Sequence, residues 1–205
     1  MIKQFFISIL FLSLLFPNEI EVVIVKDYYP TGILKSERTY KDDLLDGPYT
    51  YYRSNGTIYK QGSMKYLPPT YPGGKGQTVS FGPFKKYFYD GQLKIEGTYT
   101  DGPTNWETQI GIWKYYYGNG QLRVYNDNDN KTYKSYNRNG QIKEEGVLFG
   151  LQKPEKSYFE NGQLQLEGTY KDGKEDGIWK QYHENGQLKQ ENTYKNGKLI
   201  DFKEY

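Results

Sequence analysis

Few side chains in this sequence could perform acid–base or nucleophilic chemistry. Among its 205 residues there is no cysteine, and His183 is the only histidine. The carboxylates recur at regular spacing and do not converge as the acid and base of an active site would. We therefore predict that the protein is not an enzyme and has no catalytic residue. His183 is interpreted as a repeat variant on the packing face of a sheet.

Two short segments could be read as a metal or phosphate site. Asp127 and Asp129 lie in a run of Asn and Asp residues that lacks the glycine and distal glutamate of a calcium loop. The run Gly73-Gly74-Lys75-Gly76 lacks the spacing and the following Ser or Thr of a phosphate-binding loop. The first is interpreted as a solvated turn and the second as a plain loop. We predict no metal site and no cofactor.

Tyrosine is the one residue type whose spacing indicates a binding surface. A tyrosine stands four residues before a glycine in seven places, and these residues are called the tyrosine ladder. Its members are Tyr28, Tyr52, Tyr87, Tyr116, Tyr136, Tyr158 and Tyr182. Their rings would supply contact area at a low cost in side-chain entropy. The alternative is structural, because tyrosine suits a half-buried sheet surface and a repeat copies residues whether or not they bind.

The glycines that follow the ladder mark a repeat that runs from about residue 22 to residue 205. These seven head glycines are Gly32, Gly56, Gly91, Gly120, Gly140, Gly162 and Gly186. Most follow an Asn and lie between two runs of alternating character, which indicates a two-residue type I′ turn with positive φ at both residues. The repeat predicts about seven β-hairpins, with a loop inserted at 63–80 and the strand after Gly120 reduced to a polar turn.

In such a hairpin, the residue seven before the head glycine faces the residue six after it. The resulting pairs are Trp179 with Asn192, Trp113 with Asn126, Phe84 with Gly97, Tyr133 with Gly146, and Tyr49 with Gly62. A large ring that faces a small residue can lie flat across the bare backbone and stabilise the strand pair. The aliphatic residue two after each head glycine, such as Leu188, is expected on the same face.

The opposite face carries charge in the same register. Five lysines that stand six residues before a head glycine face a glutamate: Lys26–Glu37, Lys85–Glu96, Lys134–Glu145, Lys156–Glu167 and Lys180–Glu191. The tyrosine ladder lies between these pairs. Its rings are expected to form cation–π contacts with the cross-strand basic residues Lys35, Lys94, Arg123, Lys143 and Lys189. The pattern predicts an all-β fold, an elongated and twisted single sheet built as an array of antiparallel hairpins.

The N-terminal segment 1–17 has the pattern of an export signal. Lys3 precedes an apolar run from Phe5 to Phe16, which is shorter than the roughly 20 residues that span a bilayer as a helix. We favour a cleaved signal peptide, with a retained membrane anchor and a buried first strand as alternatives. The segment predicts a protein that is periplasmic, surface-held or secreted.

The phrases Gly177-Ile178-Trp179-Lys180, Asn185-Gly186-Gln187-Leu188 and Glu167-Gly168-Thr169-Tyr170 closely resemble the MORN-repeat variant of the YwqK family of toxin–antitoxin antitoxins. The resemblance covers nearly everything after about Val22 and departs at Val25 and Glu155, where an aromatic residue is expected. It implies a MORN-like hairpin meander that binds proteins and neutralises a partner toxin. A looser resemblance of 113–120 to choline- and glucan-binding repeats implies a ligand held between aromatic rings.

The balance of charges limits the classes of partner that the protein is expected to bind. With 27 basic and 25 acidic residues, the net charge of +2 gives no basic footprint for nucleic acid or for anionic lipid. We therefore expect no nucleic-acid partner, and contact with a membrane only through the N-terminal segment. The expected function is a protein–protein interaction module whose partner is a toxin or an envelope protein. The alternative is a cell-envelope repeat protein that binds a choline-type or glucan-type ligand.

Overall fold

The structure is a computed structural model that describes residues 20–69, 73–101, 107–148, 150 and 152–205. Every regular element in these residues is a β-strand, which confirms the predicted all-β class. A search of the described residues for a helix long and apolar enough to cross a membrane found none. The predicted signal peptide at 1–17 lies outside the described residues.

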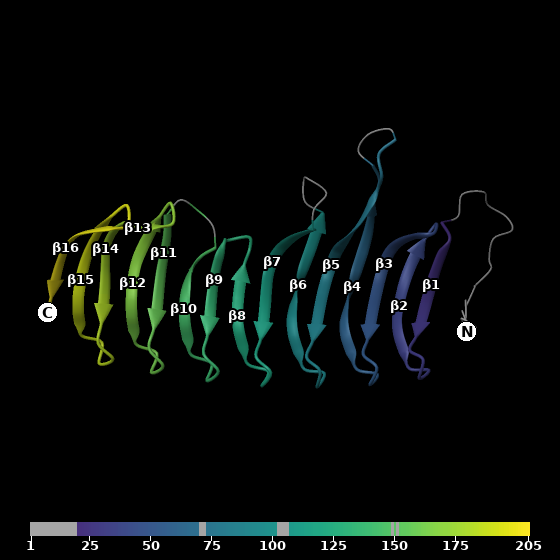
Figure 1. Cartoon of the computed structure of the whole chain (residues 1–205), viewed down its shortest axis with the longest axis horizontal. Helices are drawn as coiled ribbons and strands as arrows, with labels where there is room; N and C mark the ends of the chain where they lie inside the picture. The colour runs from purple at the N-terminus through teal and green to yellow at the C-terminus, as the bar shows by residue number, and fades with distance from the viewer. Residues whose placement is uncertain (1–19, 70–72, 102–106, 149, 151) are drawn as a thin grey trace. The chain divides into compact units, whose positions relative to one another are not determined.

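The chain divides into two compact units, Met1–Ile110 and Gly111–Tyr205. In the first unit, each strand pairs antiparallel with the next one in the sequence (Figure 1). Its strands are β1 (Val22–Tyr28), β2 (Leu34–Lys41), β3 (Leu44–Tyr52), β4 (Ile58–Leu67), β5 (Gln77–Tyr87) and β6 (Leu93–Asp101). This is the predicted hairpin meander.

The second unit continues the same pattern after β7 (Glu107–Tyr116), which begins just before the division. Its further strands are β8 (Leu122–Asp127), β9 (Thr132–Tyr136), β10 (Ile142–Val147), β11 (Gln152–Tyr158), β12 (Leu164–Lys171), β13 (Lys174–Glu175), β14 (Gly177–Tyr182), β15 (Leu188–Lys195) and β16 (Lys198–Glu204). From β7 onward, neighbours in the sequence again pair antiparallel, except that the two-residue β13 pairs beside β12 and the order continues from β12 to β14.

Two predicted boundaries are wrong. The loop predicted at 63–80 is shorter, because β4 continues to Leu67 and β5 begins at Gln77, and the two strands pair across this region. The strand after Gly120 is not reduced to a turn, because β8 forms six residues of strand before the turn at 128–131. In both places cross-strand pairing extends into segments that their breaker residues made look irregular.

The predicted type I′ turn is also wrong. The His183 carbonyl accepts from the Gly186 amide at 2.8 Å, and the His183 amide donates to the Gln187 carbonyl at 2.8 Å. Gly186 has a φ of +84°, whereas the φ of Asn185 is not positive. The turn is therefore a three-residue loop with one left-handed glycine. The Asn185 side chain instead accepts from the Gln187 amide at 3.0 Å. The amide-to-carbonyl bond of the head glycine recurs in all seven hairpins.

The predicted register nevertheless holds along the strands. Gln181 is aligned with Gln190 and Tyr182 with Leu188, so a bulge at Lys189 compensates for the longer loop. Beyond the bulge, all five ring pairs and all five Lys–Glu pairs are aligned as predicted.

The bulge changes what faces the ladder. Every ladder tyrosine is aligned with an aliphatic residue that was expected on the opposite face: Leu34, Ile58, Leu93, Leu122, Ile142, Leu164 and Leu188. The basic residue expected on the ladder ring is displaced with the bulge. The ammonium groups of Lys35 and Lys94 lie 5.9 and 5.2 Å from the ring centroids of Tyr29 and Phe88, one residue after the ladder.

Each unit has an aromatic face, on which the rings seven residues before the head glycines lie, and a charged face with the Lys–Glu pairs. The aromatic face holds the most buried rings, Trp113 at 1% and Trp179 at 4% exposed. A β-carbon built on Gly146 would lie 3.0 Å from Tyr133 Cε1, so this ring covers the bare backbone as predicted. The Trp179 ring instead covers Gly168 in the neighbouring hairpin, where a β-carbon would lie 2.1 Å from Cδ2.

Gly186→Val should destabilise the second unit by about 1–3 kcal/mol, because a β-branched residue is strained at a φ of +84°. The new side chain would also meet Gln163 Oε1, which lies 2.5 Å from a β-carbon at this position. Gly186→Asn is the matched control and should cost less, since Asn tolerates the left-handed region. Urea unfolding measures both, and equal midpoints for the valine variant and the original chain would contradict the turn assignment.

Candidate functional site

Three hydroxyls of the tyrosine ladder are hydrogen-bonded to the preceding hairpin. Tyr52 donates to Glu37 at 3.1 Å, Tyr158 to Glu145 at 2.6 Å, and Tyr182 to Glu167 at 2.7 Å. The same glutamates form ion pairs with the lysines across their own hairpins, as in Lys134–Glu145 at 3.2 Å. Each glutamate therefore joins a lysine of its own hairpin to a tyrosine of the next one.

These contacts set the pKa values of the groups involved. Burial first, and then the bond to a glutamate, raises the pKa of Tyr158 and of Tyr182 to about 12. The Tyr158 hydroxyl, and then Lys134, lowers the pKa of Glu145. A lowered carboxyl pKa contributes stability above the ordinary glutamate range, and this stability is lost as the pH falls through the lowered value. The network is therefore intact at neutral pH.

The residue after the ladder tyrosine adds a second link, which the sequence analysis missed. Tyr29 donates to the Tyr52 carbonyl at 2.8 Å, and Tyr117 donates to the Tyr136 carbonyl at 2.8 Å. Arg53 makes the equivalent bond to the Tyr87 carbonyl at 2.6 Å. No local periodicity reveals these bonds, because each joins residues in different hairpins.

The ladder thus serves hairpin-to-hairpin contacts in both units. Tyr28, Tyr52 and Tyr87 belong to the first unit, and the other four belong to the second. Tyr28 is exposed, and the other six are half-buried. The ladder residues form one regular row within each unit and do not converge on a pocket.

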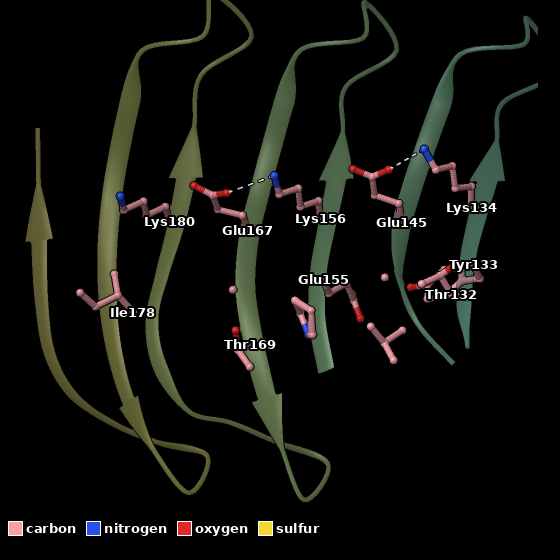
Figure 2. Close-up of a pocket in the computed structure, with 14 residues that line it drawn as sticks. Thr132, Tyr133, Lys134, Glu145, Glu155, Lys156, Glu167, Thr169, Ile178 and Lys180 are labelled. Atoms are coloured by element: carbon pink, nitrogen blue, oxygen red, sulfur yellow. Dashed lines mark ion pairs between the residues drawn. The ribbon is translucent and has the colours of Figure 1, made fainter. Parts of the chain in front are cut away.

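A groove on the charged face of the second unit is a candidate site, with a volume of about 560 Å³ (Figure 2). One wall is a row of alternating charge across β9 to β14, made by Lys134, Glu145, Lys156, Glu167 and Lys180. Figure 2 shows these side chains in line, with the Lys134–Glu145 and Lys156–Glu167 ion pairs marked. With three lysines and two glutamates, the wall offers both signs of charge to a ligand.

The other wall of the groove is a mixture of threonine and apolar side chains. It consists of Thr132, Val147, Pro154, Thr169 and Ile178, two residues further along the strands than the charged row. Between the walls lie Gly146 and Gly168, with the strand positions of Tyr133 and Glu155. Because side chains alternate along a strand, Tyr133 and Glu155 point to the aromatic face and leave mostly backbone as the floor. Ile178, 56% exposed, is the most prominent apolar group of the wall.

The first unit has a smaller hollow on its aromatic face, of about 360 Å³. Its ring-bearing lining residues are Tyr49, Tyr51, Tyr59, Phe84 and Tyr99. Two of the chain's own lysines lie over these rings. Lys60 Nζ is 5.0 Å from the Tyr51 centroid, and Lys86 Nζ is 5.2 Å from the Tyr59 centroid. Cations of the chain thus already occupy ring faces of this hollow.

The residues considered above for metal binding or acid–base chemistry take part in turns. His183 is exposed, and its backbone closes the Asn185-Gly186 turn, so its place on the packing face stays a prediction. Asp127 accepts from the Asn130 amide at 3.0 Å within a turn, and this bonding lowers the Asp127 pKa. Over the described ranges, no three His, Cys, Asp or Glu side chains gather as metal ligands.

The hairpin geometry repeats with one register, and a comparison with protein families matches the same segments. A family described as MORN repeat variant matches residues 22–42, 82–101, 109–125, 129–148, 151–172 and 175–196. The chain belongs to the MORN repeat variant family. The β3–β4 hairpin falls in an unmatched stretch but shares the repeat geometry, with Tyr49 aligned with Gly62 and Tyr52 with Ile58. A search of curated proteins found no match.

Proposed function

We propose that this MORN repeat variant protein is a non-catalytic interaction module whose groove on the second unit receives an extended segment of another protein. The groove crosses β9 to β14 between two walls, and this geometry is the main support. Five strands at about 4.8 Å spacing give a track of roughly 19 Å. An extended segment of about six residues, at roughly 3.3 Å per residue, covers that length.

The chemistry of the walls suits a peptide with mixed side chains. Val147, Pro154 and Ile178 offer apolar area, and the alternating row accepts either charge from the segment. The groove lacks a convergent set of polar groups of the kind that orient a small substrate, which favours binding over catalysis. The likeness to the YwqK antitoxins supports a toxin as the partner, and the leader supports an encounter outside the cytoplasm.

The groove is tested with the full chain as bait against the proteins of its source. Ile178→Asp should lower the affinity for the bound protein at least about tenfold, since burying an isoleucine contributes about 1.5–3 kcal/mol. Ile112→Asp is the matched control, because Ile112 holds the same repeat position, is 47% exposed and lies outside the groove lining. Calorimetric titration with the recovered and purified partner measures the affinities of all three chains.

Two results would contradict the proposal. One is equal affinity of the Ile178→Asp and Ile112→Asp variants for the partner. The other is no specific partner in repeated captures by a chain that is folded by circular dichroism. A thermal melt of each variant separates lost binding from lost folding.

A second candidate, a carbohydrate-binding function at the cell envelope, is favoured by the aromatic hollow of the first unit. Its rings and two lysines could pack against a sugar and bond to its hydroxyls. A choline-type cation suits this hollow poorly, because it would meet Lys60 and Lys86. Binding to purified cell-wall glycan that is lost in Tyr51→Ala, with the groove variants unaffected, would favour this function over protein binding.

A further inference from the structure

Glu155 is an exception in the repeat on the aromatic face. It stands seven residues before Gly162, where other hairpins carry Tyr49, Phe84, Trp113, Tyr133 or Trp179. Its neighbours in β11, Pro154 and Lys156, belong to the charged face, so the Glu155 side chain points to the aromatic face. An acid has replaced a ring at a position that is otherwise part of the packing.

Aromatic rings flank the Glu155 position on both sides. Gly146 in β10 and Gly168 in β12 are its two cross-strand partners. The Tyr133 ring covers Gly146, and the Trp179 ring covers Gly168. Figure 2 shows Tyr133 on β9 and Glu155 on β11, on either side of β10. Glu155 is half-buried, and a partly buried charge interacts more strongly than one in water.

The chain itself provides no counter-charge at this point. Within the part of the chain that the structure describes, Glu155 makes neither a hydrogen bond nor an ion pair, although Lys153 precedes it by two residues. The carboxylate of Glu144, which is itself 3.6 Å from Lys143 Nζ, acts on it electrostatically. Burial, and then Glu144, raises the Glu155 pKa. A half-buried carboxylate without a cation is unfavourable for folding, and such groups are found at functional sites.

The first hairpin of the same chain has an acid on its aromatic face that is paired with a cation. On its aromatic face, Arg38 pairs with Asp27, and its guanidinium lies 5.8 Å from the Tyr40 ring centroid. In the β11–β12 hairpin, Gly168 occupies the repeat position of Arg38, and Tyr170 occupies that of Tyr40. Glu155 stands at the repeat position of Val25 rather than of Asp27, so the later hairpin has a carboxylate and a tyrosine ring on this face but no arginine at the Arg38 position.

We propose that Glu155 binds an organic cation from outside the chain, an ammonium or guanidinium group, with Tyr133 and Tyr170 as its aromatic neighbours. The carboxylate supplies the charge, and the rings supply polarisable faces of the kind that attract such cations. This site lies on the opposite face from the groove. The proposal therefore goes beyond the proposed function and is tested independently of it. The cation is either a small quaternary ammonium compound or an arginine side chain of a bound protein.

The test titrates the full chain with Nα-acetyl-argininamide and, separately, with choline chloride, at an ionic strength held constant with sodium chloride. The amide signals of Gly146 and Gly168 in a nitrogen-15 NMR spectrum report on the site, because both glycines flank Glu155. We expect saturable shifts of these two signals. Stronger binding of choline identifies a free quaternary ammonium ligand, and stronger binding of argininamide identifies a protein side chain.

Three variants decide whether Glu155 is responsible. Glu155→Gln should weaken binding by about tenfold, equivalent to roughly 1.4 kcal/mol. Glu155→Tyr should abolish binding and raise the melting temperature, because it restores the ring of the repeat and removes the unpaired charge. Glu160→Gln, an exposed acid in the turn of the same hairpin, should bind as the original chain does.

The proposal is overturned if neither cation gives saturable shifts, or if Glu155→Gln binds as tightly as Glu160→Gln. A fall in melting temperature on Glu155→Tyr would also contradict it, since the acid would then be part of the packing. Ile178→Asp should leave cation binding unchanged, so failure at the groove and failure at Glu155 are distinguished.

Discussion

Trp179→Ala should destabilise the hairpins around β14 by about 3 kcal/mol, at the low end for truncation of a buried aromatic residue. The ring is 4% exposed, lies across Gly168 in β12, and meets the Tyr170 ring edge-on at a centroid distance of 4.8 Å. Its loss removes contacts between two hairpins. Because each hairpin of a repeat array is stabilised by its neighbours, the effect should concentrate in β12, β14 and β15.

Limited proteolysis and amide hydrogen exchange of the second unit measure this effect locally, and urea unfolding measures its size. Ile178→Ala is the control, since Ile178 is the adjacent residue but points to the charged face and is 56% exposed. Its cost should stay within about 0.5 kcal/mol. Unaltered protease resistance around β14 in the Trp179→Ala chain would show that the ring does not hold the hairpins together.

Gly168→Ala is the second substitution that we expect to lower the free energy of unfolding strongly, although it adds only one methyl group. The new β-carbon would lie 2.1 Å from Trp179 Cδ2 and 2.4 Å from Cε2, so the ring must move off the strand. We expect a cost toward the upper end of the roughly 1–3 kcal/mol typical of overpacking. Gly118→Ala is the matched control, because nothing lies within 4 Å of a β-carbon there.

A double-mutant cycle tests the mechanism of this effect. In a chain that already carries Trp179→Ala, the Gly168→Ala change should cost much less, since the atoms it displaces are gone. The interaction energy between the two positions should therefore fall within about 0.5–3 kcal/mol. Additive costs in urea unfolding would mean that the glycine is required for a reason other than the ring above it.

The strand register was predictable because it depends on local periodicity. Side chains alternate along each strand, so the aromatic and charged positions could be assigned to opposite faces from spacing alone. The turn geometry was not predictable in the same way. Asn185 bonds through its side chain to the Gln187 amide, and the resulting longer loop is offset by a bulge at Lys189. Two deviations of one residue cancel along the strands and leave their pairing as predicted.

The candidate sites were less predictable than the fold. The tyrosine ladder was found from its spacing, but its hydroxyl bonds to glutamates of the preceding hairpin were not, since they join residues far apart in the sequence. The groove was missed because its apolar wall is an irregular mixture of Thr, Val, Pro and Ile. Glu155 was visible in the sequence only as a departure from the repeat. Its importance appeared once the rings on either side of it were placed.

The sequence by itself determined the hairpin repeat, the two faces and the cross-strand partners, because these follow from turns and from alternation within about 25 residues. Only the tertiary structure decided which ring covers which glycine, as when Trp179, although aligned with Asn192, lies on Gly168 of the neighbouring hairpin. It also decided where a groove opens and that, among the described residues, Glu155 has no paired cation. These features arise between hairpins, where packing rather than local propensity selects the contacts.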